Sequence, residues 1–491
     1  MASLSASVQA VELTDSLADP SLFSMLSKDR VSTNRPWVGY LRAPRLLSLL
    51  TALIAVSIPM RAHPQRLVPL SRAGASGPNE VSVAIDPSDP RRIVAVSMQR
   101  LEGIDHIAYV SHDAGQHFEE LPGPNPSGRT QGDDAIRFDA EGRAFWSYIS
   151  FAGLRVEQPP VAANGIFLNR SSNGGRDWET TTVVDHINTV MPFEDKPYLA
   201  IDMEESSPHR GAIYIAWTRF SRYGSSDPRE TSDIYLSVSR DHGVSFSMPQ
   251  RVSDEPGDAI DSDGTLKGAV PVIAPNGDVI LVWAGPQGLV VDRSDDGGSS
   301  FGKDRHLIET PGGWDIDVPG IFRANGMPVT AVDRSGGPWN GRLYVNWVDE
   351  RSGSLDVYVI HSSDLGASWS APIRVHAESA PRDQFLSWMA VDGVDGSVNV
   401  VFYDRTDLNG TLTGVTLARS VDGGQTFVTH PIAPGLMDPF ATQDDVFFGD
   451  YIGVDALDGR VVVAFTHFVG ERRLALSAAI FDFVPKSQTL R

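Results

Sequence analysis

Acidic residues recur at one kind of position in this chain, directly before short runs of β-branched and aromatic residues. These acidic positions are Glu80, Asp133, Asp134, Glu194, Asp195, Asp383 and Asp450. If folding brings several of them together, they could bind a cation or supply the two carboxylates that hydrolyse an ordinary glycosidic bond. If it does not, each is a separate turn or strand-entry residue in contact with solvent.

Arginines follow several of these apolar runs, and one precedes such a run. They are Arg219 in WTRF, Arg351 in WVDERSG, Arg405 in FYDRTD, and Arg382 before QFLSWMAV. Asp349 and Asp404 lie close before two of these arginines and could form surface ion pairs with them. If the arginines point toward a common axis instead, they could recognise an acidic or polyhydroxylated sugar.

Two repeats in the sequence indicate the elements that must position these side chains. The first is Ser-x-Asp-x-Gly-x-x-aromatic, which begins at residues 111, 171, 239, 294, 362 and 420, with Asn173 replacing the aspartate once. The second is a glycine followed by β-branched and aromatic residues, with a large ring six positions later. It begins at residues 142, 211, 277, 341, 396 and 459. Such runs behind a turn glycine are typical of β-strands.

The two repeats run in step, so each unit is predicted to fold as four antiparallel strands. A four-stranded sheet cannot bury both faces alone, whereas sheets stacked radially around an axis can. The sequence therefore predicts an all-β fold, a β-propeller of four-stranded antiparallel blades. Seven units begin near residues 80, 133, 196, 267, 328, 384 and 448, and six blades are the alternative. The seventh unit lacks the motif, and RLVPLS from Arg66 is expected to supply its outer strand.

The serine, aspartate and glycine of the first repeat are residues that stabilise a tight turn. Because a catalytic group is needed once per site, six copies indicate a structural role. The motif is identified as the Asp-box, or BNR repeat, and with six copies the chain resembles the sialidase superfamily over about residues 65–485. The resemblance implies an exported sialidase-like glycoside hydrolase that acts on glycans at the axial face of the propeller. A non-catalytic propeller that binds glycan or protein is the alternative, and known sialidases usually have six blades.

The resemblance also implies a set of catalytic residues. Sialidases use an aspartate as acid and base, and a tyrosine nucleophile that a glutamate activates. In VSMQRLEGIDHIAYVSHDAG, Asp105 corresponds by position to the acid/base, and Arg100 to one of three arginines that bind the substrate carboxylate. In FFGDYIGV, Tyr451 corresponds to the nucleophile, with Asp450 beside it. Asp105 could instead be an ordinary loop residue and Tyr451 a core residue of its strand.

Two of the three carboxylate-binding arginines have no counterpart in the motifs of this chain. Glu80 and Val81 stand where the first is expected, and Arg419 lies directly beside the last Asp-box instead of earlier in its strand. The candidate substitutes for substrate binding are therefore Arg219, Arg351, Arg382 and Arg405.

Charge and composition limit the partners of the chain. It has 62 Asp and Glu against 41 Lys and Arg, and the net charge of -21 would repel nucleic acids and anionic membranes. The absence of cysteine excludes disulfides and thiolate metal sites. Motifs for phosphate, dinucleotide and zinc-protease chemistry are also absent. The expected partner is a carbohydrate, and no cofactor is expected apart from a structural cation that the acidic positions could hold.

Residues 1–62 are predicted to be an N-terminal extension, followed by a single propeller domain over residues 63–491. Within the extension, Arg42 and Arg45 precede an apolar run from Leu46 to Met60. This pattern predicts a signal peptide in segment 42–62, because the run is too short to span a membrane comfortably. A signal anchor is the alternative. We expect an exported protein, secreted or periplasmic, with no membrane attachment once the signal is removed.

Overall fold

The computed structural model describes residues 65–72, 75, 77–100, 104–154, 162–377, 382–405, 412–441, 446–469 and 473–483. These residues form strands β1 to β30 and one 3-10 turn, η1 (Pro439–Ala441). The predicted extension, its segment 42–62 and the domain boundary at residue 63 lie outside the described residues. In the described part, no helix is long and apolar enough to cross a membrane.

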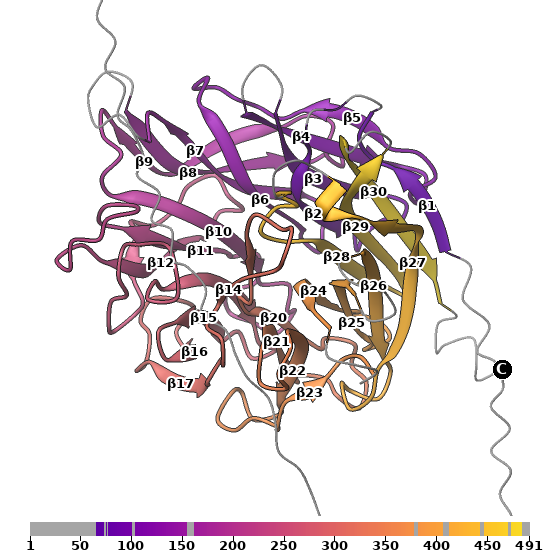
Figure 1. Cartoon of the computed structure of the whole chain (residues 1–491). Helices are drawn as coiled ribbons and strands as arrows, with labels where there is room; N and C mark the ends of the chain where they lie inside the picture. The colour runs from indigo at the N-terminus through magenta and orange to yellow at the C-terminus, as the bar shows by residue number, and fades with distance from the viewer. Residues whose placement is uncertain are drawn as a thin grey trace, which may run out of the picture. The chain divides into compact units, whose positions relative to one another are not determined.

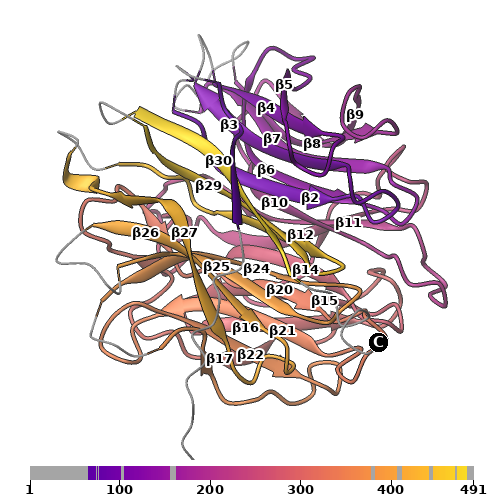
Figure 2. The same ribbon diagram turned by 90° about the vertical axis from the view of Figure 1, so that its right-hand side faces the viewer.

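Seven four-stranded antiparallel sheets surround a common axis, as Figures 1 and 2 show from two directions. In blades 1 to 6 the hydrogen-bonded order of the strands follows the chain, and the first strand lies innermost. The predicted all-β fold is therefore confirmed as a seven-bladed propeller, and the six-bladed alternative is wrong.

The strands of blades 1 to 4 are the following. Blade 1 has β2 (Asn79–Ile85), β3 (Ile93–Arg100), β4 (Ile104–Ser111) and β5 (Glu119–Pro122). Blade 2 has β6 (Thr130–Phe138), β7 (Ala144–Ala152), β8 (Ala163–Ser171) and β9 (Glu179–Ile187). Blade 3 has β10 (Phe193–Ile201), β11 (Ile213–Phe220), β12 (Ser232–Ser239) and β13 (Gln250–Arg251). Blade 4 has β14 (Lys267–Ile273), β15 (Val279–Gly285), β16 (Gly288–Ser294) and β17 (Arg305–Ile308).

The remaining strands form blades 5 to 7 and one small hairpin. The hairpin, β18 (Asp315–Ile316) with β19 (Ala324–Asn325), precedes blade 5. Blade 5 has β20 (Val329–Val332), β21 (Leu343–Asp349), β22 (Asp356–Ser362) and β23 (Ile373–Arg374). Blade 6 has β24 (Gln384–Val391), β25 (Val398–Asp404), β26 (Thr413–Ser420) and β27 (Val428–Met437). Blade 7 has β28 (Gly453–Leu457), β29 (Arg460–Val469), β30 (Arg473–Asp482) and β1 (Gln65–Pro69).

The ring is closed by strands from both ends of the described chain. β1 pairs antiparallel with β30, with Gln65 opposite Phe481 and Pro69 opposite Ser477. The segment around Arg66 thus supplies the outer strand of blade 7, as predicted. This pairing covers an edge that a linear array of blades would leave open.

The large rings of the second repeat are buried in the second strand of each of blades 2 to 7. They are Tyr148, Trp217, Trp283, Trp347, Phe402 and Phe465, and each is at most 1% exposed. Burying a large ring of this kind stabilises a fold by roughly 1.5–3 kcal/mol. The second repeat therefore marks one core position in each of blades 2 to 7.

Each Asp-box forms the turn between the third and fourth strands of its blade. In the last copy, the Gly424 N–H donates to Ser420 Oγ at 2.9 Å, and Asp422 Oδ1 accepts the N–H groups of Gln425 and Thr426 at 3.0 Å. The first copy has the same contacts around Ser111. The side chains of the motif are thus occupied in stabilising their own turn.

Candidate functional site

The innermost strands of five blades contain the same β-bulge, and it determines which side chains reach the axis. The register slips by one position after Asn79, Gly132, Asp195, Lys267 and Phe385. The first residue of every bulge has a positive φ: Glu80 (53°), Asp133 (54°), Lys196 (52°), Gly268 (74°) and Leu386 (49°). This left-handed conformation suits glycine and strains other residues. Strain held at charged residues is a recognised mark of functional sites.

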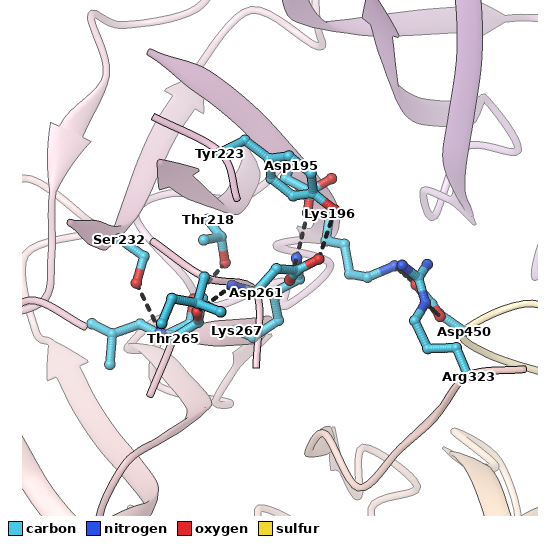
Figure 3. Close-up of polar contacts among 12 residues, drawn as sticks. Asp195, Lys196, Thr218, Tyr223, Ser232, Asp261, Thr265, Lys267, Arg323 and Asp450 are labelled. Atoms are coloured by element: carbon cyan, nitrogen blue, oxygen red, sulfur yellow. Dashed lines mark hydrogen bonds and ion pairs between the residues drawn. The ribbon is translucent and has the colours of Figure 1, made fainter. Parts of the chain in front are cut away.

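Eight charged side chains meet at this end of the axis, and we call them the axial charged cluster. They are Glu80, Asp133, Asp195, Lys196, Asp261, Lys267, Arg323 and Asp450. Six of them belong to the innermost strands or to the segment just before β28, whereas Asp261 and Arg323 come from loops. Figure 3 shows Lys196 reaching toward Asp450 and Arg323, and Lys267 beside Asp195 and Asp261.

The first group is centred on Lys196. Its ammonium donates to Asp133 Oδ1 at 3.1 Å and also to Asp450, and it lies 4.0 Å from Glu80 Oε1. Arg323 Nε donates to the other oxygen of Asp450 at 2.6 Å. Because Lys196, Asp133, Asp450 and Glu80 are each at most 7% exposed, these charges interact in a medium that screens them weakly.

The second group is centred on Lys267, whose ammonium contacts both Asp195 and Asp261. The Tyr223 hydroxyl donates to Asp261 Oδ2 at 2.7 Å. The ammonium of Lys267 also lies 4.8 Å from the centre of the Phe220 ring. Two buried lysines are thus each held by carboxylates from different blades or loops.

The carboxyl groups of the cluster differ in their proton affinity. Burial, together with the neighbouring Asp133 and Asp450, raises the pKa of Glu80 to about 8, although Lys196 opposes this rise. Burial also acts on Asp450, but Lys196 and Arg323 outweigh it and hold the pKa of Asp450 well below its usual range. Glu80 is therefore protonated at neutral pH beside an ionised Asp450. Neighbouring carboxyl groups with divergent pKa values are typical of acid and base pairs in enzymes.

Three carboxylates of the cluster could in principle hold a cation. One oxygen each of Glu80, Asp133 and Asp450 lies within 4.8 Å of the others. The Lys196 ammonium, however, bonds two of these carboxylates and lies near the third. An internal ammonium therefore already supplies the positive charge that a metal ion would bring, and the residues present fit a metal poorly unless Lys196 moves away.

A cavity of about 180 Å³ adjoins the cluster. Its charged lining includes Glu80, Asp133, Asp195 and Lys196, and its apolar lining includes Ile149, Phe151, Phe193, Tyr223 and Phe447. Aromatic walls around a few converging polar groups are characteristic of small-molecule sites. The cavity is therefore the place where a ligand could reach Glu80 and Asp133 together.

Two loops bring further side chains to this cavity. The Phe322 N–H donates to the Val446 carbonyl at 2.8 Å, and the Val446 N–H donates to Gly320 O at 3.1 Å. This pairing places Arg323 over the Phe447 ring, 5.2 Å from its centre. Phe322 is 68% exposed and meets Phe447 edge to face. The rim of the cavity thus has an aromatic surface that water can reach.

Four of the acidic residues predicted from sequence meet in the cluster, and three do not. Glu80, Asp133, Asp195 and Asp450 are members. Asp134 accepts hydrogen bonds from Trp146 Nε1 and contacts His106, while Glu194 accepts from Trp217 Nε1 and Arg219. Asp383 lies 3.7 Å from Arg405. These three acidic residues therefore contact side chains that do not belong to the axial charged cluster.

The four candidate arginines lie outside the lining of the cavity. Arg219 is bound by Glu194, Arg351 by Asp349, and Arg405 donates to the Pro319 carbonyl at 2.8 Å. Arg382 lies just before β24. Among the described residues, Arg323 is the one arginine that lines the cavity. The substrate-binding roles of the four candidates remain predictions.

Tyr451 lies close to the cluster but has no carboxylate partner for its hydroxyl group among the described residues. The hydroxyl donates to the main-chain oxygen of Asp134 at 3.2 Å, and the ring packs near Tyr198 and Trp388. Burial, followed by the neighbouring carboxyl groups of Glu80 and Asp133, raises the pKa of Tyr451 well above its usual value. A neutral phenol is a weak nucleophile. Its assignment as nucleophile remains a prediction.

The other two catalytic candidates are described only by their backbone. Arg100 ends β3, and Asp105 pairs with Gln99 near the start of β4. Their side chains lie outside the described part of the structure. Both residues lie at the same end of the β3–β4 strand pair in blade 1, and their catalytic and binding roles remain predictions.

Sequence reasoning missed Lys196, Lys267, Asp261, Tyr223 and Arg323. A signal existed for the two lysines, because the predicted units begin at residues 80, 133, 196 and 267, and each of these residues is charged. No comparable signal existed for the other three, which come from loops outside the repeats.

No protein-family model matches this chain, and no curated protein does either. Solved structures with a similar trace include an ulvan lyase, with 12% identity, a TM-score of 0.47, and coverage of 83% of this chain and 95% of that one. An intramolecular trans-sialidase from Ruminococcus gnavus has 13% identity, a TM-score of 0.41, and coverage of 84% of this chain and 97% of that one. An alpha-L-arabinanase from Penicillium chrysogenum has 13% identity, a TM-score of 0.45, and coverage of 86% of this chain and 98% of that one. At these values the likeness concerns the fold alone. The resemblance to the sialidase superfamily therefore rests on the six Asp-boxes of the sequence.

Proposed function

We propose that this chain is a glycan-acting propeller, a glycoside hydrolase whose reaction takes place at the axial charged cluster. The observation that carries the proposal is the pair formed by Glu80 and Asp133. Both line the same cavity, and one oxygen of each lies within 4.8 Å of the other. Because the pKa of Glu80 is about 8, this carboxyl group holds a proton at neutral pH and can donate it.

In the proposed reaction, Glu80 protonates the glycosidic oxygen as its bond to the anomeric carbon breaks, and an Asp133 oxygen attacks that carbon to form a glycosyl ester. Water, which gives its proton to the Glu80 carboxylate, then displaces Asp133 from the anomeric carbon and restores both residues. The two carboxyl oxygens lie within 4.8 Å of each other, which is below the roughly 6.5–9.5 Å separation of the carboxyl groups in inverting enzymes. We therefore expect the anomeric configuration to be retained. Asp450 has a positioning role, since it holds both Lys196 and Arg323.

The substrate class follows from the walls of the cavity. Phe151, Phe193, Tyr223 and Phe447 offer aromatic surface beside hydrogen-bonding charged groups. A sugar ring has apolar C–H faces and a polar rim of hydroxyl groups, so it suits such a lining. The exposed ring of Phe322 extends this surface outward and would contact the next sugar of a chain.

Sialidase activity is the finer form of the proposal. It would use Asp105 as acid/base, Tyr451 as nucleophile, and Arg100 with other arginines as the carboxylate clamp. Arg323 is available on the cavity for such a clamp, although Asp450 already binds it. Neutral glycosides are therefore the first substrates to test, with sialosides beside them.

A non-catalytic glycan-binding propeller is the second candidate. It is favoured by the size of the cavity, about 180 Å³, which is below the roughly 300–1,000 Å³ of usual small-molecule sites. Export to the cell exterior or periplasm is also part of the proposal, on the basis of segment 42–62.

The test is hydrolysis of a panel of fluorogenic neutral glycosides and a sialoside by the wild type, Glu80→Gln and Tyr451→Phe. A glutamine at position 80 cannot donate the proton, so kcat/KM should fall about 100-fold or more. Glu119→Gln is the matched control, because Glu119 is exposed on β5 of the same blade. If only Tyr451→Phe abolishes turnover, the Glu80 mechanism is wrong and the sialidase form is favoured. No turnover with glycan binding retained would favour the binding module.

A further inference from the structure

A second cavity lies on the axis at the other ends of the innermost strands. Its volume is about 420 Å³, and all seven innermost strands contribute to its lining. β2 runs from the charged cluster at Glu80 to this cavity at Ile85, and β6 runs from Asp133 to Phe138. The two cavities are therefore separate sites at opposite ends of the same strands.

The lining of the second cavity is mostly apolar, with three charged residues, Arg137, Arg334 and Asp455, and the polar Thr330. The walls include Leu199, Val270, Met389 and Val454. Val394, which also lines the cavity, is 51% exposed, so the cavity is open to solvent at this point. A volume of this size lies within the roughly 300–1,000 Å³ of usual ligand sites.

The positive charge in this cavity is incompletely balanced. Arg137 donates to its neighbour's carbonyl, Ile136 O, at 2.8 Å, and no carboxylate of a described residue forms an ion pair with it. Burial lowers the pKa of Arg137, and Asp455 opposes this only from a distance. Arg137 is half-buried, and its guanidinium would gain a charge-assisted hydrogen bond from a ligand that supplies an anion.

Asp455 contributes one negative charge to the lining, so the two arginines exceed it by one positive charge. Arg334 lies 2.9 Å from Glu204 and donates to the Ile273 carbonyl, so its partner is a carboxylate outside the cavity lining. Asp455 accepts the Ile85 N–H at 2.7 Å, and burial raises its pKa to about 6. Arg137 and Arg334 both line the cavity.

We infer that the second axial cavity binds a small organic carboxylate between Arg137 and Arg334. Guanidinium groups match the two oxygens of a carboxylate in charge and geometry. The apolar walls contact the hydrocarbon part of the ligand, which distinguishes it from a hydrated inorganic anion. This site does not depend on the hydrolase proposal, because it shares no residue with the axial charged cluster.

Calorimetric titration of the full chain with benzoate tests the inference, with benzamide as the neutral isostere. Benzoate should bind at least about tenfold more tightly than benzamide, a difference of about 1.4 kcal/mol. Arg137→Gln and Arg334→Gln should each weaken benzoate binding about tenfold or more, and either variant suffices if the other fails to fold. Arg229→Gln is the control, since Arg229 is exposed and paired only with Asp227.

Three outcomes would overturn the inference. They are equal affinity for benzoate and benzamide, unchanged benzoate affinity in both arginine variants, and binding of sulfate with none of benzoate. Glycoside hydrolysis by the Arg137→Gln protein should equal that of the wild type. Failure of this site and failure of the hydrolase proposal are therefore observed in separate measurements.

Discussion

Glu80 and Lys196 occupy the same position of the same β-bulge in blades 1 and 3, and their side chains meet at the axis, 4.0 Å apart. The same β-bulge therefore places opposite charges from different blades next to each other at the axis. In blade 4 the equivalent residue is Gly268, and in blade 6 it is Leu386. Because glycine adopts this conformation without strain, the charged residues at the other bulges are retained against a conformational cost.

The strain at the bulge can be measured at Gly268. A Cβ added there would lie 2.9 Å from Met327, whereas one added at Gly336, which also has a positive φ, would meet nothing within 4 Å. We expect Gly336→Ala to lower the free energy of unfolding by about 1 kcal/mol, from backbone strain alone. Gly268→Ala should lower it by more, because the methyl group also displaces Met327. Urea unfolding of both variants checks this, and equal losses would contradict it.

Removing the Lys196 ammonium should destabilise the propeller strongly. Lys196→Met leaves Glu80, Asp133 and Asp450 buried together with Arg323 as their main counter-charge. Breaking such a buried group costs about 3 kcal/mol or more in the free energy of unfolding at pH 7.

Lys303→Met is the matched control for this lysine variant. Lys303 is 87% exposed, and among the described residues its ammonium group pairs only with Asp254. Its loss should change the free energy of unfolding by less than about 0.5 kcal/mol. If the two lysine variants were equally stable, the ammonium of Lys196 would contribute nothing to the cluster.

The pH dependence of the unfolding free energy reports the protonation state of Glu80. Its pKa is about 8 in the folded chain against an ordinary value of 4.5, so the folded state binds this proton more tightly than the unfolded state. The resulting stabilisation is fully present below pH 4.5 and is lost as the pH rises through 8. Glutamine cannot ionise. The unfolding free energy of the wild type relative to Glu80→Gln should therefore fall by more than about 1 kcal/mol between pH 5 and 8. Parallel pH curves for the two proteins would show that Glu80 has an ordinary pKa.

The aromatic rim should affect substrate binding more than the chemical step. Phe447→Ala removes a ring that lines the cavity and lies beneath Arg323. On a glycoside that the wild type hydrolyses, we expect KM to rise about tenfold, equivalent to about 1.4 kcal/mol, with kcat changed by less. Met248→Ala is the control, because Met248 is 86% exposed and does not line the cavity. A fall in kcat at unchanged KM would place Phe447 in the chemical step instead.

Much of the fold could be predicted because its signals are local. The Ser-x-Asp-x-Gly turn is built from contacts within eight residues, as at Ser420 to Phe427, so its chemistry is visible in the sequence. The ring six residues after each turn glycine marks a core position for the same reason. Six copies of each pattern then determine the blades, since a single four-stranded sheet cannot bury both faces.

Tertiary structure decided which residues belong to the axial charged cluster. The one-position slip after Asp195 gives Lys196 a left-handed backbone and directs it to Asp133 and Asp450, residues that lie 63 and 254 positions away. Arg323 reaches the axial charged cluster because its loop forms hydrogen bonds with Val446.

The sequence by itself determined the repeat, the strands and the turns, because hydrophobic alternation and turn chemistry act between near neighbours. Only the closed ring decided that Glu80, Lys196 and Asp450 share one buried space and that Arg137 and Arg334 share another. The physical reason is that burial and Coulomb interaction depend on distance through space, and closure around the axis brings together residues that the chain separates by a hundred positions or more.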